Sequence, residues 1–281
     1  MKKTLLALVL ILIFTFSGCK ESENSNTIKL SVSISPVATF VKNVCGDKAE
    51  VITMIPTGAS AETYEMSPKE IATFSQSAVF FSVGVPAEEN GILPHIAKTT
   101  KIVDLASSVN AVYPDLKIGN ERDPHIWLSP KRAIIMIEEI CNELCILDPE
   151  NSEIYRKNAS DYIEKLDSVN NQITNTFKDK RRKVFYISHP SFSYFAVDFG
   201  LDMISLEKDG KEISPKELAE IIDIAKKSGA KVIFYQEESS KKMAEAFAKE
   251  IGGKTEILSP LSPDYCDNLL KTATLIHGAL H

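Results

Sequence analysis

The stretch PENSEIYRKNASDYIEKLDSVNNQITNTFKD, residues 149–179, contains no glycine, no internal proline and no strand-like run. Its apolar residues recur at spacings of three and four, which places them on one face of a helix. They are Tyr155, Ala159, Tyr162, Leu166, Val169, Ile173 and Phe177. About 30 helical residues would extend roughly 45 Å, about the length of a domain. Near the middle of the chain, such a helix predicts a stiff connection between two lobes. The alternative, one more surface helix, is disfavoured by its length.

Short β-rich runs alternate with helical segments on both sides of this stretch. They are residues 28–34, 51–55, 78–83 and 101–105 before it, and residues 184–187, 202–206, 231–235 and 255–258 after it. Such alternation is typical of parallel sheets covered by helices. The sequence therefore predicts an α/β fold.

Several helix starts are clearly marked. The sequence SPKE occurs at residues 67–70 and again at residues 214–217. Each copy offers an N-cap serine, a proline at the first helical position and a glutamate that can bond back to the cap. Ser129-Pro130 and Asp148-Pro149 open two more helices in the same way. The repeated SPKE hints at two similarly built halves, although a four-residue match is weak support for a repeat.

The first residues form a targeting segment. Two lysines, an apolar run and the sequence FSGC make residues 1–18 a secretory signal that is too short for a stable membrane span. The cysteine after FSG resembles the lipobox of bacterial lipoproteins, which would make Cys19 the lipidated first residue of the mature chain. Phe16 departs from the leucine more common there, and the alternative is an ordinary secreted protein cut nearby. Residues 19–27 are polar, as expected of a tether.

Charge and cysteine content exclude some classes of protein. The net charge is −6, and an acidic chain argues against nucleic acid as a partner, because phosphate binding needs clustered lysine and arginine. The four cysteines after residue 19 match neither a zinc knuckle nor a disulfide-rich scaffold. We expect small buried thiols.

Ligands of open α/β sheets bind beyond the carboxyl ends of the strands, where loops turn into helices. Polar residues at such places are Glu62, His125, His189 and Ser259. Two come from each half of the chain, so they could converge on a cleft between lobes. Two imidazoles and a carboxylate suit zinc, and also manganese or ferrous iron. Their long spacing proves nothing by itself, and a histidine beside proline is more often a hydrogen-bonded structural residue.

The other histidines are weaker candidates. His95 lies in an irregular stretch and is expected to be exposed. His277 and His281 are four residues apart, a spacing suited to a shared ligand, but they lie at the very end of the chain beside Gly278. Fraying argues against a site there, and histidine is favourable in a last helical turn without any ligand.

Three motifs carry a family resemblance. DPHIWLSP at residues 123–130, SHPSFSYFAVDFGL at residues 188–201 and ETYEMSP at residues 62–68 together resemble the zinc/manganese-binding solute-binding lipoproteins of bacterial metal ABC transporters, of the cluster A-I type. The similarity runs from about Ile28 to the C-terminus. It implies two four-stranded α/β lobes joined by a rigid helix, with one buried divalent ion between them. Such a protein collects the ion outside the cytoplasmic membrane and delivers it to a permease.

The resemblance also implies an organisation for the whole chain. The expected parts are an N-terminal lobe at residues 28–148, a linking helix at residues 149–180 and a C-terminal lobe at residues 181–281. The protein would be a monomer, anchored by lipid through Cys19 and facing the periplasm or the cell exterior. Its partners would be an ABC permease and the ion, and it would not be an enzyme.

Carried over residue by residue, the family's metal ligands match only in part. His125 matches the histidine of the Asp-Pro-His-Ile-Trp turn, and His189 matches the third ligand. Glu62 stands where the family normally has a histidine, and Ser259 stands where it normally has an aspartate before Pro-Leu. The histidine-rich loop of many zinc-binding members is missing between residues 84 and 123.

These departures change the expected site. Glu62, His125 and His189 would bind zinc, or else manganese, as cargo, with Ser259 at the fourth position. A serine hydroxyl is a poor zinc ligand, so a water molecule, Glu237 or Asp264 would complete the shell. Trp127 and Tyr64 are expected to exclude water and orient the ligands. Affinity should fall below about pH 6 as the histidines protonate.

Two other functions stay open on the sequence alone. Three protein ligands and a water molecule also describe the open site of a periplasmic zinc-dependent hydrolase. However, the chain has neither an HExxH nor a G-x-S-x-G motif. Alternatively, the loss of two usual ligands would make the protein a degenerate member that binds another ligand or a surface partner.

Overall fold

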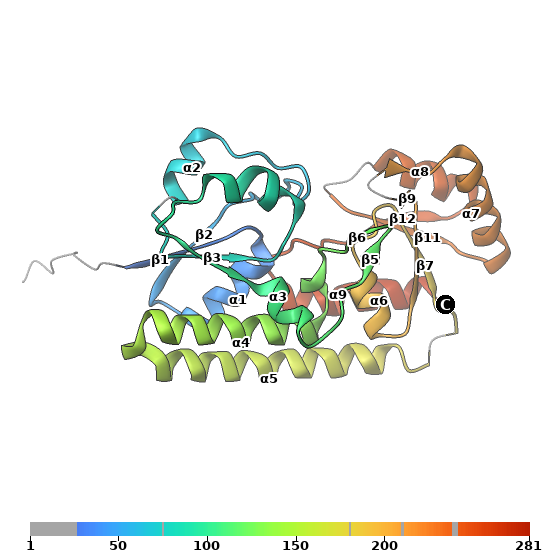
Figure 1. Ribbon diagram of the computed structural model, residues 1–281. Helices are drawn as coiled ribbons and strands as arrows, with labels where there is room; N and C mark the ends of the chain where they lie inside the picture. Colours follow the sequence, from blue (N-terminus) through green and yellow to red (C-terminus); the bar gives the residue numbers. More distant parts are fainter. Residues whose placement is uncertain (1–26, 75, 180, 209–210, 238–240) are drawn as a thin grey trace, which may run out of the picture.

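The computed structural model describes residues 27–74, 76–179, 181–208, 211–237 and 241–281. The predicted signal at residues 1–18, and Cys19 with nearly all of the tether, lie outside the described residues. Within the described part of the chain, no helix is both long and apolar enough to cross a membrane. Figure 1 shows two groups of strands side by side, with two long helices beneath the first group, one of which extends further toward the second.

The first group of strands forms a four-stranded parallel sheet. Its members are β1 (Ile28–Val32), β2 (Ala49–Thr53), β3 (Val79–Ser82) and β4 (Lys101–Asp104). Their order across the sheet is β2-β1-β3-β4. The connections between strands carry α1 (Ser35–Cys45) and α2 (Pro68–Phe74), and α3 (Leu105–Asn110) follows β4.

The second group forms another four-stranded parallel sheet. Its members are β7 (Val184–Ile187), β8 (Asp202–Ser205), β11 (Val232–Tyr235) and β12 (Lys254–Ile257). The connections between them carry α6 (Ser193–Asp198), α7 (Pro215–Ser228) and α8 (Lys241–Glu250). Read from β8, the order is β8-β7-β11-β12, so both sheets place their second strand first, then the first, third and fourth. The predicted α/β fold with two parallel sheets is confirmed.

The two copies of SPKE occupy equivalent places in this common order. Each lies between the second and third strands of its sheet, where it opens α2 or α7. In both, the glutamate Oε2 accepts a hydrogen bond from the serine backbone N–H, at 2.7 Å for Ser67 and 3.0 Å for Ser214. In both, the serine Oγ accepts from the glutamate backbone N–H in return. The shared strand order thus agrees with two similarly built halves.

The second of these capping boxes gives a prediction of modest size. Ser214→Ala is expected to lower the free energy of unfolding by about 1 kcal/mol, because it removes an N-cap acceptor from α7. Thermal unfolding measures the change, with Glu220→Ala on the exposed middle of the same helix as control. Equal midpoints for the two variants would contradict the role of the cap.

Two helices connect the two sheets along the chain, and a third follows the last strand. They are α4 (Pro130–Leu147), α5 (Ser152–Thr176) and α9 (Tyr265–Ala279). Figure 1 shows α4 and α5 side by side, with α5 extending further toward the second group of strands. At 1.5 Å per residue, its 25 residues span roughly 38 Å. It is shorter than predicted because residues 149–151 form a 3-10 turn and Phe177 is already the C-cap.

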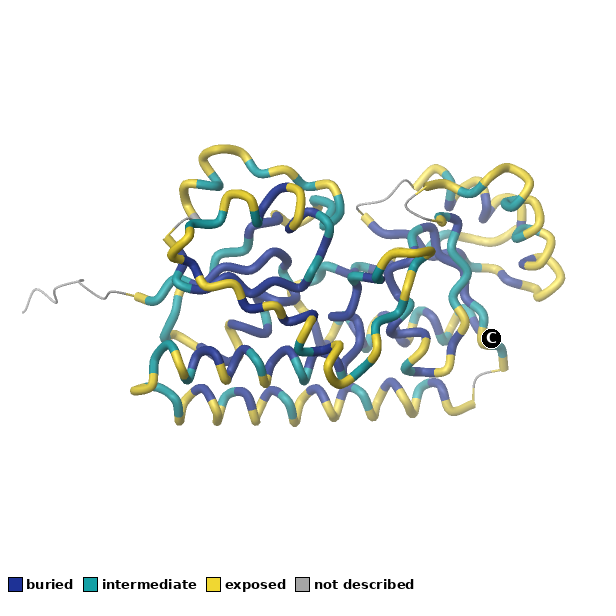
Figure 2. The backbone as a smooth tube through the Cα atoms, in the orientation of Figure 1, coloured by how far each residue is buried: buried dark blue, intermediate teal, exposed yellow. Residues whose placement is uncertain are grey.

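The apolar stripe predicted for this helix is confirmed. All seven of its residues are buried, and Figure 2 shows α5 buried along one face and exposed along the other. The buried stripe belongs to a core that also includes Phe81 of the first sheet and Phe185 of the second. A smaller core, which includes Ile233 and Phe247, lies on the second sheet alone.

Polar contacts near the start of α4 also join the two halves. The Asp198 carboxylate of α6 accepts hydrogen bonds from Ser129 Oγ and Arg132 Nη1 and pairs with Lys131 Nζ, at 2.5, 3.0 and 2.6 Å. Trp127 Nε1 donates to the carbonyl of Pro260 at 2.8 Å. These bonds fix the segment before α4 against the second half of the chain.

Two details complete the fold. The sequence did not predict two hairpins of two-residue strands, β5 (Lys117–Ile118) with β6 (Glu121–Arg122), and β9 (Glu207–Lys208) with β10 (Lys211–Glu212).

The cysteines after residue 26 are free thiols, as expected. Cys45, Cys141 and Cys266 are buried and Cys145 is half-buried.

Candidate metal centre

Glu62 lies on the loop between β2 and α2. Its backbone N–H donates to Ser60 Oγ at 3.1 Å, and the carbonyl of Ala61 accepts from Ala87 N at 3.1 Å. These two bonds hold the loop against the start of the helical turns after β3. The Glu62 side chain is 37% exposed, so one side of the carboxylate faces solvent.

His125 is fixed by the Asp-Pro turn that precedes it. The Oδ1 atom of the fully buried Asp123 accepts from His125 backbone N at 2.9 Å and bonds His125 Nδ1 at 2.8 Å. A proton on Nδ1 leaves Nε2 free as a ligand atom, an arrangement common among metal-binding histidines. The ring of Trp127 lies 5.3 Å from that of His125 and lines the same cavity.

His189 follows β7 and lies between two carboxylates. Its Nδ1 is 2.7 Å from Glu207 Oε2, and its Nε2 is 2.9 Å from Glu62 Oε1. The Gln236 side-chain amide donates to the carbonyl of His189 at 3.3 Å, and it also donates to Ser191 Oγ. The amide of Gln236 fixes the backbone of His189 at the end of β7, and the carboxylate of Glu207 fixes its ring.

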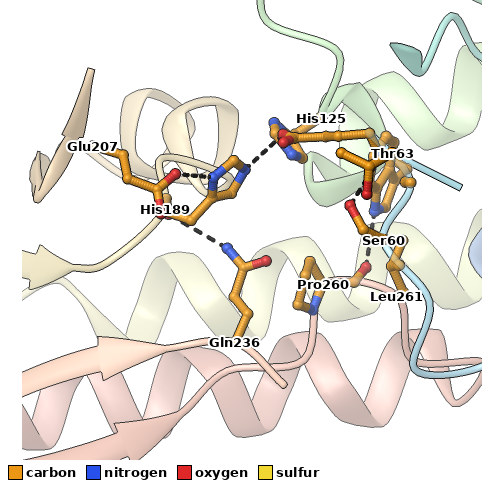
Figure 3. A pocket seen from close by; sticks show the side chains of 11 residues that line it. Ser60, Thr63, His125, His189, Glu207, Gln236, Pro260 and Leu261 are labelled. Carbon is orange, nitrogen blue, oxygen red and sulfur yellow. Dashed lines mark hydrogen bonds and ion pairs between the residues drawn. The ribbon is translucent and has the colours of Figure 1, made fainter. Parts of the chain in front are cut away.

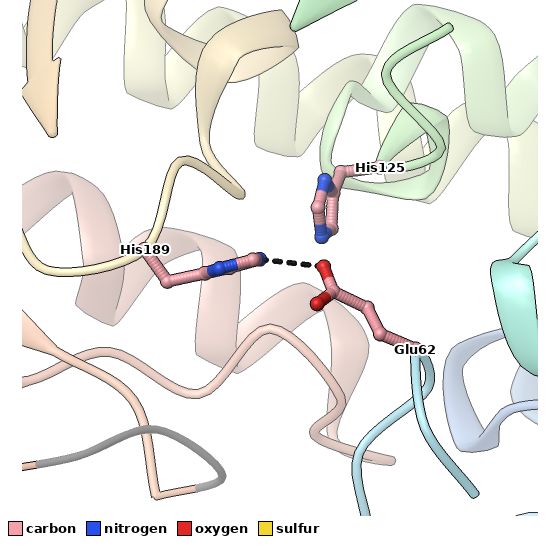
Figure 4. Close-up of side chains that lie close together, drawn as sticks. All are labelled: Glu62, His125 and His189. Atoms are coloured by element: carbon pink, nitrogen blue, oxygen red, sulfur yellow. Dashed lines mark ion pairs between the residues drawn. The ribbon is translucent and has the colours of Figure 1, made fainter. Parts of the chain in front are cut away.

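The three predicted ligands converge on one point. One ligand atom from each of Glu62, His125 and His189 lies within 4.8 Å of the others, and Figure 4 shows the three side chains pointing toward one another. They line a cavity of about 240 Å³ (Figure 3). Ligands bound at 2.0–2.2 Å to a tetrahedral ion are roughly 3.5 Å apart. Small side-chain adjustments would therefore seat one ion among them.

The predicted fourth position is not on the cavity wall. Among the described residues, the cavity is lined by Pro260 and Leu261 but not by Ser259, whose carbonyl accepts from Asn268 Nδ2 at 2.7 Å. Glu237 and Asp264 are exposed and do not line it either.

Of the two residues expected on the cavity wall, one lies there and the other does not. Trp127 lines the cavity, in agreement with the expectation. Tyr64 does not; its hydroxyl donates to Glu70 Oε1 at 2.6 Å at the start of α2. Burial, together with this bond to the carboxylate, raises the pKa of Tyr64 to about 12.

Sequence reasoning missed Glu207 and Gln236, which also line the cavity. Glu207 comes directly after the predicted strand at residues 202–206, and Gln236 directly after the one at residues 231–235. Both therefore fit the rule that ligands bind beyond the carboxyl ends of strands. The sequence therefore places both residues where ligand-binding side chains are expected.

The charges around His189 set its protonation before any ion arrives. Burial by itself lowers the pKa of His189, but hydrogen bonds to Glu207 and Glu62, together with their negative charges, raise that pKa to about 9. The hydrogen bond from His189 lowers the pKa of Glu62, although burial acts in the opposite direction. At neutral pH the metal-free cavity therefore holds an imidazolium between two carboxylates.

The remaining histidines form no comparable group. His95 is exposed, as expected. The Nε2 atoms of His277 and His281 lie 2.9 Å apart at the end of α9. Within the described ranges, no third histidine, cysteine or carboxylate joins them in a metal-ligating cluster.

Fold and site together define a class of protein. Two parallel sheets of the same strand order share one long helix, and a cavity holds two imidazoles and a carboxylate from three separate chain segments. This is the architecture of a two-lobed solute-binding protein whose cavity holds a group of side chains able to bind a metal ion. The family model described as "Zinc-uptake complex component A periplasmic" matches residues 31–279, and the chain belongs to this family.

Curated relatives agree with this assignment. The high-affinity zinc uptake system protein ZnuA of Bacillus subtilis (strain 168) is 31% identical over 263 residues, which cover 87% of this chain and 82% of the relative. The zinc-binding lipoprotein AdcA of Streptococcus pneumoniae (strain R6) is 30% identical over 278 residues, which cover 93% of this chain. The match spans 56% of the AdcA chain, slightly more than half of its length.

Solved structures share the fold. A crystal structure of ZnuA superposes with a TM-score of 0.86 at 31% identity, covering 91% of this chain and all of the other. The Zn(II)-bound ZnuA-like domain of Streptococcus pneumoniae AdcA superposes with a TM-score of 0.75 at 30% identity, covering 90% of this chain and 99% of the other.

Proposed function

We propose that this protein is an extracytoplasmic receptor of an ABC importer. It captures a divalent cation in the cavity between its two sheets and delivers the ion to a permease. The ion is cargo and undergoes no reaction, so the protein acts as a receptor rather than as an enzyme. Glu62, His125 and His189 are the proposed ligands.

The convergence of these three side chains is the observation that carries the proposal. Their ligand atoms come from loops after β2 and β7 and from the turn before α4, yet they lie within 4.8 Å of one another. Each histidine has its Nδ1 bonded to a carboxylate, so Nε2 is the nitrogen that would bind the ion; in His189 this atom would exchange its contact with Glu62 for the ion. Membership of a zinc-uptake family gives the cluster its proposed use.

Zinc is the proposed cargo, with manganese second. Two imidazole nitrogens and one carboxylate oxygen form a donor set that zinc accepts in tetrahedral sites, and the curated relatives described above are named for zinc. Manganese prefers oxygen ligands, and only one of the three proposed protein ligands, Glu62, is an oxygen donor. A water molecule completes the proposed shell, because Ser259 does not line the cavity.

The proposed setting follows from the relatives and from the start of the chain. AdcA is named a lipoprotein, and the sequence around Cys19 resembles a lipobox. We therefore propose a monomer anchored by lipid through Cys19, with its cavity facing the periplasm or the cell exterior. Its proposed protein partner is the permease of the importer.

Calorimetric titration of chelator-stripped protein tests the proposal. Zinc is expected to bind saturably at one ion per chain with submicromolar affinity, and manganese more weakly at the same site. Competition between the two ions shows whether they share the site. Absence of saturable zinc binding at micromolar concentrations would remove the proposed function and would favour a degenerate member with another ligand.

A further inference from the structure

Glu207 is a charged residue of the cavity that neither the motifs nor the proposed ligand set uses. Its Oε2 is 2.7 Å from His189 Nδ1, and its side chain is 21% exposed. Its backbone is fixed by the hairpin, in which Glu207 pairs with Glu212 and Ser205 Oγ donates to the carbonyl of Glu207 at 2.6 Å. The carboxylate is therefore held beside the imidazole by the fold itself.

The position of Glu207 excludes a direct role as metal ligand while it holds this bond. Figure 3 shows Glu207 and His125 on opposite sides of the His189 ring. The bond uses Nδ1, whereas Nε2 is the atom that faces Glu62 and the point of convergence. Glu207 can act on an ion only through His189.

The two carboxylates at His189 come from equivalent places in the two halves. Glu62 lies on the loop after β2, the second strand of the first sheet, and Glu207 lies two residues after the end of β8, the second strand of the other. One contacts Nε2, where the ion would bind, and the other contacts Nδ1 behind the ring. His125 has the same support, with Asp123 behind its Nδ1.

We propose that Glu207 is a positioning residue for zinc capture. This inference rests on the proposed function. Glu207 accepts a hydrogen bond from Nδ1–H of His189, fixes the tautomer in which Nε2 is free to bind the ion, and makes that nitrogen a stronger electron donor. The Glu207 carboxylate stands behind His189 as that of Asp123 stands behind His125, and it adds negative charge beside the ligands. Bonds of this kind behind metal-binding histidines are worth about 10- to 100-fold in metal affinity.

Substitution of Glu207 tests the inference by two readouts. Glu207→Ala is expected to weaken zinc binding about 10- to 100-fold in competition with a chromophoric chelator. Glu207→Gln is expected to weaken zinc binding less than Glu207→Ala does, because its amide oxygen can still accept a hydrogen bond from Nδ1–H of His189. In histidine-labelled, zinc-loaded protein, the His189 Nδ1–H resonance is expected in the wild type and in Glu207→Gln, and is expected to be lost by exchange with water in Glu207→Ala.

Glu212→Ala is the matched control. Glu212 is exposed on the opposite strand of the same hairpin, so its removal changes the same charge nearby without touching His189. Thermal unfolding of the metal-free variants checks that the hairpin and the fold persist. Glu207→Ala protein that binds zinc like Glu212→Ala, or that keeps the Nδ1–H resonance, overturns the inference while the proposed function stands. Wild-type protein without saturable zinc binding overturns both.

Discussion

His125→Ala or His189→Ala is expected to weaken zinc binding by about two to three orders of magnitude. Structural zinc sites with four ligands in zinc-finger peptides have apparent binding free energies of about 10–16 kcal/mol, or roughly 2.5–4 kcal/mol per ligand. Each 1.4 kcal/mol is about tenfold in affinity. Both imidazoles are nearly buried in the cavity, so solvent supplies no equivalent nitrogen in their place. Competition with a chelator of known affinity measures the loss.

His95→Ala is the control for both variants. His95 is exposed at the end of a short 3-10 turn and lies outside the cavity, so its removal should leave zinc affinity unchanged. Similar affinities for His125→Ala and the wild type would mean that the ion binds elsewhere, and the ligand assignment would then be wrong.

Zinc affinity is expected to rise about tenfold per pH unit from about pH 7 to about pH 9, and then to level off. The pKa of His189 in the metal-free protein is raised to about 9, by hydrogen bonds and charges from Glu207 and Glu62 that outweigh burial. Below that pH the ring carries a proton on Nε2 that zinc must displace, so binding weakens as the pH falls. Glu62 stays ionised throughout this range because its pKa is lowered.

Calorimetry in two buffers of different ionisation enthalpy measures the displaced proton. About one proton per zinc is expected to leave the protein near pH 7.5, and none above about pH 10. Equal affinities at pH 7 and pH 9 would show that His189 is neutral before binding. The sequence alone placed the loss of affinity below about pH 6, because nothing in it revealed a carboxylate on each side of this ring.

Much of the fold was predictable because its signals are local. Each of the eight apolar runs became a strand of one of the two sheets, and the seven-residue stripe of α5 is buried as its spacing indicated. The ends of α5 were less predictable, since Pro149 allows a 3-10 turn as readily as the first turn of an α-helix. Hairpins such as β9–β10 could not be predicted, because strands of two residues are too short to show a periodic pattern of apolar residues.

Strand ends and motifs point to the three proposed ligands, and strand ends also point to Glu207 and Gln236, but no local pattern predicts the bonds among these side chains. His125 and His189 follow from strand ends and from motifs, and Glu62 follows from its place in a known turn. The hydrogen bond between Glu207 and His189 joins residues 18 apart in the chain. It depends on the hairpin that holds Glu207, which no sequence pattern predicts. The distance of Ser259 from the cavity wall depends on how the chain turns after β12, which no local pattern fixes.

The shared core has a consequence for the speed of ion capture. Residues from both sheets, together with the stripe of α5, belong to one buried cluster, so the walls of the cavity are preorganised before the ion arrives. Little of the binding free energy is then consumed in closing the halves on each other. We therefore expect the approach of the hydrated cation and the loss of its water, rather than a slow domain motion, to set the rate of association.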